Sequence, residues 1–294
     1  MKKLFLFSLL SAFVSFAFIK KEKQVETAPP VLFAVLNDGQ YIEAIATLED
    51  GKLVQAIGGD ETSTPASFSA VYYKAGDSYR LIYGGKDNGK VTVVSSNAET
   101  ECAATTANVK ISSSKLRLKG FEMALATNIS TTKPASGVRK APTAAEKIVI
   151  DKLVIKEFQK NKIPVKGLKA VKLTAIDADN NKVNEIVGTY TVSPNSAERG
   201  LLFFIATKTK TGYTINYSEC RRIKKDEVMS GEIVDVDGGI YQEMLLDILD
   251  TDNDGRAEIF TVTQSFEGIG FQSYQWDGKA WTRGLEVSNY HCGY

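Results

Sequence analysis

Two segments in the C-terminal half carry oxygen-bearing side chains at alternating positions, and they align at an offset of 73 residues, from Asp177 to Asp250. Side-chain oxygens at positions 1, 3, 5 and 9 of a tight loop converge on one point, where a main-chain carbonyl at position 7 joins them. A hard divalent cation is the partner that such a set of oxygens fits. The predicted ligands are Asp177, Asp179, Asn181, the carbonyl of Val183 and Glu185 in the first segment, and Asp250, Asp252, Asp254, the carbonyl of Arg256 and Glu258 in the second.

Calcium is the cation that this pattern predicts. Ca²⁺ takes six to eight oxygen ligands at about 2.3–2.6 Å, and a glycine at position 6, here Gly255, accommodates the sharp turn of the loop. Without a cation, the carboxylates of the second loop would repel one another. The first loop has Asn181 and Lys182 at positions 5 and 6, so it lacks one carboxylate and the glycine. The alternative for each loop is a polar turn that holds no ion.

The spacing distinguishes these loops from EF-hands. An EF-hand places a bidentate glutamate at position 12, where the two segments have Gly188 and Thr261. The Asp-x-Asp-x-Asp-Gly-x-x-Glu loop instead resembles the FG-GAP or VCBS-type repeats of integrin-like β-propellers and of many secreted bacterial proteins. This resemblance covers the C-terminal half only, and it implies a Ca²⁺ ion between the first two strands of a four-stranded blade.

Each acidic loop lies between two β-like segments, and two more such segments follow it, so two four-stranded antiparallel units are predicted. Their strands are 171–176, 186–192, 201–207 and 213–218, then 245–249, 259–264, 271–276 and 280–287. A two-residue turn at Asp277-Gly278 would place Tyr274 opposite Trp281. A closed seven-bladed ring needs more than about 350 residues, and this chain has 294. The units therefore form either an incomplete propeller or sandwich-like sheets beside an N-terminal β domain.

The N-terminal half has the pattern of antiparallel β meanders. Asp38-Gly39 and Asp50-Gly51 favour the positive φ values of tight turns between the segments 31–37, 40–48 and 52–57. The alternation of Phe68, Ala70 and Tyr72 with smaller or polar residues predicts a half-buried strand within 67–74.

One short helix is predicted in the middle of the chain. Thr143 and Glu146 have the spacing of a capping box, and Pro164 discourages helical geometry just before it, so the helix should end near Asn161. The prediction is thus an all-β protein with an N-terminal β domain at 31–127, a Ser/Thr-rich linker at 128–142, and the helix plus two repeats at 143–294.

The first residues are typical of an export signal. Residues 1–17 combine two lysines, an apolar run and small residues at the expected cleavage site, which predicts a signal peptide followed by a charged leader at 18–30. The apolar run is shorter than the roughly 20 residues that span a bilayer, and no later segment is long enough. A periplasmic or secreted protein without an integral membrane segment is expected.

Three cysteines, Cys102, Cys220 and Cys292, are an odd number for an exported chain. One disulfide and one free thiol are expected, and all three pairings stay open. A bond from Cys292 to either partner would hold the C-terminal tail in place.

Composition narrows the classes of function. The formal charge is +1, from 36 basic and 35 acidic residues, which gives no electrostatic reason to expect nucleic acid as a partner. The single histidine, His291, lies at the C-terminus and makes histidine-based catalysis improbable. The favoured hypothesis is a non-catalytic exported module with structural Ca²⁺ that binds a glycan or a protein. The alternative is a metal-dependent hydrolase that uses the acidic loops, and paired carboxylates of a glycoside hydrolase would leave no local signature.

Overall fold

The fold is described from a computed structural model that covers residues 28–114, 116–135 and 138–292. The predicted signal peptide at 1–17 and most of the predicted leader lie outside the described residues. In the part of the chain that is described, no helix is both long and apolar enough to cross a membrane.

The N-terminal half forms a closed β barrel. Its strands follow the order β1-β7-β4-β5-β6-β2, and β1 pairs with both β7 and β2, which closes the ring, while β3 lies beside β2. The barrel strands are β1 (Val31–Leu36), β2 (Tyr41–Glu49), β3 (Lys52–Gln55), β4 (Ser78–Tyr83), β5 (Lys86–Ser96), β6 (Thr106–Ser112) and β7 (Ala124–Thr127). The two predicted Asp-Gly turns are confirmed: Asp50 and Gly51 form the two-residue turn of β2–β3, and Asp38 and Gly39 lie in the short 3-10 turn η1 (Asn37–Gly39), all with positive φ.

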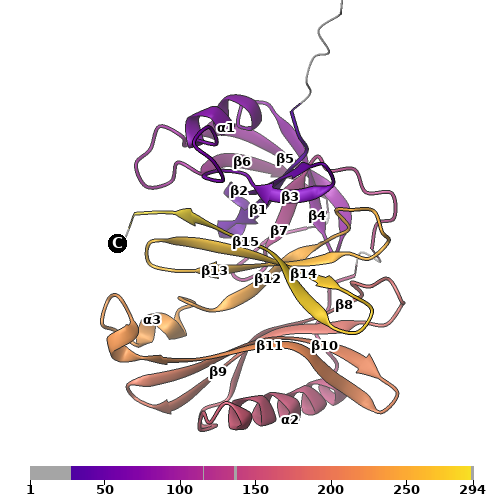
Figure 1. The fold of residues 1–294 in the computed structure, drawn as a ribbon, viewed down its shortest axis with the longest axis vertical. Coiled ribbons are helices and arrows are strands. Elements are labelled where there is room, and N and C mark those ends of the chain that lie inside the picture. Colours follow the sequence, from indigo (N-terminus) through magenta and orange to yellow (C-terminus); the bar gives the residue numbers. More distant parts are fainter. Residues whose placement is uncertain (1–27, 115, 136–137, 293–294) are drawn as a thin grey trace, which may run out of the picture.

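The predicted strand within 67–74 is wrong, because this segment contains helix α1 (Pro65–Tyr72), which lies at one end of the barrel (Figure 1). Thr64 and Ser67 form a capping box, and Pro65 occupies the first helical turn, where its missing N–H costs nothing. Phe68 and Tyr72 are buried and Ala70 is exposed. Residues four apart share one face of a helix and also one face of a strand, so the alternation alone could not distinguish the two.

The C-terminal half contains the two predicted four-stranded antiparallel sheets. Sheet B consists of β8 (Lys169–Ile176), β9 (Glu185–Asn195), β10 (Glu198–Thr209) and β11 (Gly212–Lys224), and sheet C of β12 (Glu243–Leu249), β13 (Glu258–Gln264), β14 (Gly268–Trp276) and β15 (Trp281–Tyr290). Two short turns of helix, η2 (Lys225–Glu227) and α3 (Val234–Asp237), lie between the sheets in the chain.

The predicted helix is confirmed as α2 (Ala144–Lys160), with the capping box of Thr143 and Glu146 at its start. Its apolar side, Ile150, Val154 and Phe158, packs on the outer face of sheet B. Figure 1 therefore shows four layers, in the order barrel, sheet C, sheet B and α2. This arrangement corresponds to sandwich-like sheets beside an N-terminal β domain.

The predicted pairing of Tyr274 with Trp281 is wrong. The β14–β15 turn contains four residues, so Trp276 pairs with Trp281 and Tyr274 lies opposite Arg283; an irregularity between Gln272 and Tyr274 shifts the register only farther from the turn. The side chain of Asp277 stabilises the longer turn by accepting hydrogen bonds from the N–H groups of Lys279 and Ala280 at 2.7 and 2.8 Å.

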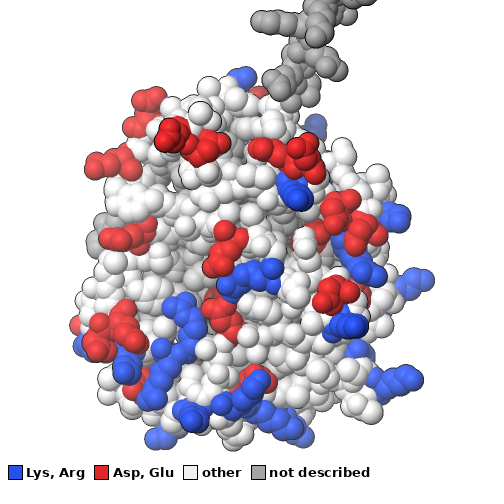
Figure 2. All heavy atoms as spheres, in the orientation of Figure 1, with Lys and Arg blue, Asp and Glu red and all other residues white. Residues whose placement is uncertain are grey.

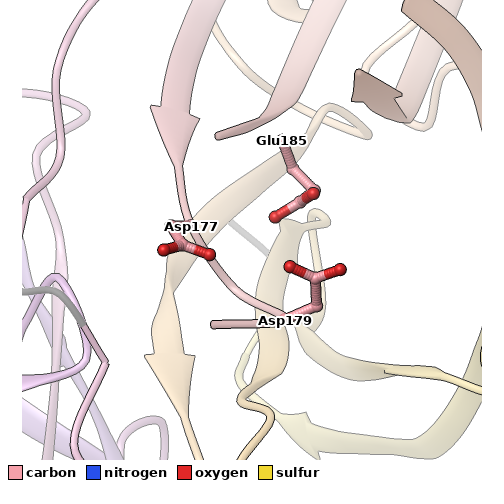
Figure 3. A group of neighbouring side chains, drawn as sticks. All are labelled: Asp177, Asp179 and Glu185. Atoms are coloured by element: carbon pink, nitrogen blue, oxygen red, sulfur yellow. The ribbon is translucent and has the colours of Figure 1, made fainter. Parts of the chain in front are cut away.

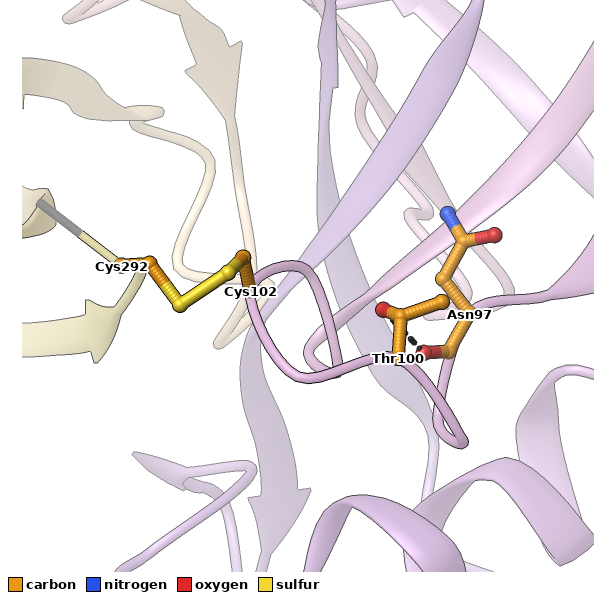
Figure 4. The surroundings of a disulfide bond; sticks show 4 residues. All are labelled: Asn97, Thr100, Cys102 and Cys292. Carbon is orange, nitrogen blue, oxygen red and sulfur yellow. Dashed lines mark hydrogen bonds between the residues drawn. A yellow bond between two sulfur atoms is a disulfide. The ribbon is translucent and has the colours of Figure 1, made fainter. Parts of the chain in front are cut away.

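A disulfide joins Cys102, in the segment after β5, to Cys292 at the end of the chain (Figure 4), and Cys220 is a half-buried free thiol. One bond and one free thiol were expected, and the structure selects this pairing. Next to the bond, Glu43 of β2 accepts hydrogen bonds from Asn289 and from His291, at 3.0 and 2.8 Å. The last strand is therefore fastened to the barrel covalently and by a buried polar cluster.

Candidate metal centres

The first acidic loop connects β8 to β9 and brings three carboxylates together. Oxygens of Asp177, Asp179 and Glu185 all lie within 4.8 Å of one another, and the side chains face a common space (Figure 3). Asp177 is 4 % exposed and Glu185 is fully buried. Such a group could hold a metal ion.

The second acidic loop connects β12 to β13 and also forms a triad. Here oxygens of Asp250, Asp252 and Asp254 lie within 4.8 Å of one another. Asp250 is 3 % exposed, whereas Asp252 and Asp254 reach the surface. The two loops therefore combine different positions of the shared pattern, which are 1, 3 and 9 in the first and 1, 3 and 5 in the second.

The same hydrogen bonds shape both loops. The carboxylate at position 1 accepts the N–H of position 6 at 3.0 Å in each, from Lys182 to Asp177 and from Gly255 to Asp250. The glutamate at position 9 accepts the N–H of position 2, from Ala178 at 3.0 Å and from Thr251 at 2.9 Å. Side chains at positions 3 and 5 accept the N–H groups two residues later, and these four bonds are Asn181 to Asp179, Val183 to Asn181, Asp254 to Asp252 and Arg256 to Asp254.

Backbone conformation follows the same scheme. Positions 4 and 6 have positive φ in both loops, at 60° and 70° for Asn180 and Lys182, and at 63° and 95° for Asn253 and Gly255. Asparagine tolerates this left-handed region, whereas lysine is strained there. The first loop thus keeps the turn although it lacks the expected glycine.

The remaining predicted ligands have different environments. The amide of Asn181 donates to Asp179 Oδ2 at 2.7 Å, so position 5 of the first loop is tied to a neighbouring acid. Glu258 lies outside the second triad, and its Oε2 accepts both the N–H and the hydroxyl of Thr251. Val183 and Arg256, whose carbonyls were predicted as ligands, are exposed residues of the loops.

Burial governs the electrostatics of both loops. It raises the pKa of Glu185 to about 8 and that of Glu258 to about 7, from an ordinary value of 4.5. Burial also raises the pKa of Asp250, and the nearby Asp252 and Asp254 add to this increase. A divalent cation among these carboxylates would favour their ionised forms and so lower their pKa values.

Buried oxygens test whether a cation fits. Within the described residues, Oδ1 of Asp177, Oε1 of Glu185 and Oδ1 of Asp250 are buried and have no hydrogen-bond partner. A buried polar atom without a partner costs about 1–3 kcal/mol, and more when it is charged. A cation bound by these oxygens would remove that cost, so the donor set fits a hard, oxygen-preferring ion.

The two loops lie against each other and against the segment that leaves the barrel. Ala257 N–H donates to the carbonyl of Ala178 at 2.7 Å. Asn253 accepts the N–H of Thr132 at 2.7 Å and donates to the carbonyl of Ser130 at 3.1 Å. The pair of loops therefore lies where the barrel, sheet B and sheet C meet.

Sequence reasoning missed the supporting residues at positions 2 and 4. Thr251 binds Glu258 through its hydroxyl, and Asn180 and Asn253 provide the left-handed turns. Asparagine occurs at position 4 of both loops and was the available signal. Comparison with protein-family models, with curated proteins and with solved structures gives no match to this chain. The resemblance to FG-GAP and VCBS-type repeats accordingly stays a prediction that depends on the two loops.

Proposed function

We propose that this protein is an exported, non-catalytic β module whose two acidic loops bind Ca²⁺ as a structural ion, and whose ligand is a glycan or a protein. The observation that supports this proposal is the pair of equivalent buried carboxylates, Asp177 and Asp250, each with one oxygen that lacks a hydrogen-bond partner within the described residues. Residues 1–17 support export, since they have the pattern of a signal peptide.

Calcium fits better than softer transition metals because every predicted ligand is an oxygen, from a carboxylate, an amide or a main-chain carbonyl. Magnesium demands a stricter octahedral arrangement and releases its water reluctantly. The loops lie where the barrel, sheet B and sheet C meet, so an ion bound in each loop would hold these three layers together.

A structural role is favoured over metal-dependent hydrolysis. A hydrolytic metal needs an open coordination position that faces the substrate. Asp177 and Asp250 are instead buried where the two loops touch each other, and the contact between Ala257 and Ala178 closes that side. No observation on these loops favours catalysis.

Thermal unfolding in Ca²⁺ and in excess chelator tests the proposal. At a free Ca²⁺ concentration 100 times the Kd, each site adds about 2.7 kcal/mol, or about 5–10 °C in the melting temperature of a domain of this size. The double variant Asp177→Asn/Asp250→Asn should lose this increase. Asp226→Asn, which changes an exposed acid in η2, should keep it. An unchanged melting temperature of the unmodified protein would eliminate structural calcium.

A further inference from the structure

The interface between sheets B and C changes character along its length. At one end the facing side chains are apolar, with Ile176, Val187 and Ile205 of sheet B against Ile248 and Ile259 of sheet C. At the other end the sheets enclose a cleft of about 660 Å³, whose lining combines polar residues of both sheets with apolar ones such as Leu201 and Ile269. The inner faces of packed sheets are normally apolar, so packing alone does not account for the polar end.

The change occurs within single strands. On β13, Ile259 belongs to the apolar end, whereas Thr261 is hydrogen-bonded among the polar residues and Thr263 lines the cleft. On β14, Tyr274 is followed on the same face by Gln272 and Gly270, which line the cleft and pair with Thr261 and Thr263. Residues two apart point to the same side of a strand. The alternation along these strands thus stays regular. Toward the cleft, however, the inward-facing positions carry polar side chains or glycine instead of aliphatic side chains.

Glu243 is a buried acid in the lining of this cleft. It is 9 % exposed, and its Oε1 accepts hydrogen bonds from the hydroxyls of Thr261 and Tyr274, both at 2.6 Å. Because Glu243 belongs to the lining, a donor that enters the cleft can reach its carboxyl.

Arg283 and Glu219 belong to the same lining. Arg283 pairs with Glu219 and donates to the hydroxyl of Tyr217 at 2.9 Å, while its Nε is buried without a partner in the described chain. Tyr217 and Tyr274 are in ring contact, with centroids 4.5 Å apart, so the two polar groups are linked through the tyrosines. In Figure 2, acidic and basic atoms lie side by side at the level between β15 and β11.

We infer that this cleft between sheets B and C is the ligand site and that it binds a neutral oligosaccharide, with Glu243, Gln272 and Arg283 as its main polar contacts. This inference rests on the proposed function of a glycan- or protein-binding module. A sugar hydroxyl both donates and accepts, so one ligand class could donate to the Glu243 carboxylate and accept from the unpartnered Nε–H of Arg283.

The size and charge of the cleft support a neutral sugar. Its volume lies within the roughly 300–1,000 Å³ typical of small-ligand sites. The lining carries four glutamates, among them Glu219 and Glu243, against Arg221 and Arg283, which disfavours an acidic ligand. Tyr290, 68 % exposed among the lining residues, offers an aromatic face to the C–H side of a sugar ring.

Titration calorimetry of the full chain in excess Ca²⁺ tests the inference. The probes are five neutral tetrasaccharides, namely cellotetraose, maltotetraose, xylotetraose, mannotetraose and chitotetraose, and one acidic control, an oligogalacturonate. At least one neutral tetrasaccharide should bind with a Kd of about 1 mM or tighter. Binding of none of them, or of the oligogalacturonate alone, would overturn the inference.

Two variants and a matched control locate the site. Gly270→Val adds a side chain to the lining, and the backbone there tolerates it, because φ is ordinary and the nearest atom to a new Cβ is the flexible end of Gln272, at 3.4 Å. Gln272→Ala removes a polar contact. Each should weaken binding at least tenfold, whereas Gln275→Ala, on the same strand but exposed outside the lining, should leave binding unchanged.

The same variants separate this inference from the proposed cation role. Gly270→Val and Gln272→Ala should keep the Ca²⁺-dependent increase in melting temperature, which also shows that they are folded. Sugar binding that survives both variants would overturn the assignment of the cleft. A melting temperature insensitive to Ca²⁺ would instead contradict only the proposed cation sites.

Discussion

The two four-stranded units have the same loop but different surroundings. Each loop is shaped by the position-1 aspartate and the position-9 glutamate, which accept the N–H groups of positions 6 and 2. The outer face of sheet B is covered by the single helix α2, whereas the outer face of sheet C is covered by the barrel. The loop geometry therefore depends on the loop's own hydrogen bonds and not on what the sheet packs against.

The loops also differ in which acidic side chains could bind a cation. In the second, the Thr251 hydroxyl gives Glu258 an extra hydrogen bond, and Asp254 takes its place in the triad. In the first, the glutamate itself joins the triad: Glu185 accepts the Ala178 N–H through Oε2, and its Oε1 is buried without a partner in the described chain. The first triad therefore uses the glutamate at position 9, and the second uses the aspartate at position 5.

The largest loss of stability should come from removing a buried side chain between α2 and sheet B. Phe158 is fully buried between α2 and sheet B, so Phe158→Ala should lower the free energy of unfolding by about 3–5 kcal/mol through a cavity. Chemical denaturation measures this loss. Ile148→Ala, on the same helix but 58 % exposed, should cost less than about 0.5 kcal/mol. Equal losses would contradict the assignment of α2 as the cover of sheet B.

A smaller effect should distinguish the two loops as cation sites. The second loop carries four acidic side chains against three in the first, so Asp250→Asn should remove more of the Ca²⁺-dependent stability than Asp177→Asn. The expected loss for Asp250→Asn is about 2.7 kcal/mol when free Ca²⁺ is 100 times the Kd. Melting temperatures with Ca²⁺ and with chelator give both values. A larger loss for Asp177→Asn would show that the buried Glu185 matters more than the number of acids.

The pH dependence should differ between the sheets as well. Burial raises the pKa of Glu243 on β12 to about 7, and the same ladder position of β8 holds Ala170. Between pH 4.5 and 7 the folded protein keeps a proton that the unfolded chain releases, so this carboxyl stabilises at low pH and its contribution is lost as pH rises through 7.

In the unmodified protein, the free energy of unfolding should therefore decrease between pH 6 and 7.5. Glu243→Gln should make this decrease smaller by about 1 kcal/mol. Denaturant titrations at several pH values measure it, with Glu99→Gln, an exposed acid of the barrel half, as the control. A decrease that persists unchanged in Glu243→Gln would assign the titration to another group.

Local signals predicted much of this fold. The spacing of Thr143 and Glu146 predicted α2, and the repeated Asp and Asn residues predicted both acidic loops, because capping boxes and Asx turns involve residues two to five positions apart. The failures are also local: Phe68 and Tyr72 fit two periodicities, and Trp276 faces Trp281 because Asp277 closes a longer turn.

Long-range contacts could not be predicted. Closure of the barrel depends on the pairing of β1 with β7. The cleft depends on Glu219 of sheet B and Glu243 of sheet C lining the same space. No short sequence pattern encodes either contact. The disulfide partner of Cys292 was open for the same reason, since cysteine spacing does not determine connectivity.

The smallest effect should come from exchanging position 6 between the loops. Lys182 has φ of 70°, a conformation that costs an L-residue about 1–2 kcal/mol, whereas glycine loses about 0.5–1 kcal/mol through its greater freedom in the unfolded chain. Lys182→Gly should therefore stabilise the chelator-treated protein by about 0.5–1 kcal/mol, and Gly255→Lys, at φ of 95°, should destabilise it by at least as much. A Cβ at Gly255 would lie 3.3 Å from the Lys133 side chain, which is flexible enough to move, so the backbone conformation decides the sign of the stability change.

Urea denaturation in chelator measures both variants without the contribution of the ion. Opposite signs would establish that the two loops share one backbone turn, and two losses would show that Lys182 stabilises the first loop through its side chain.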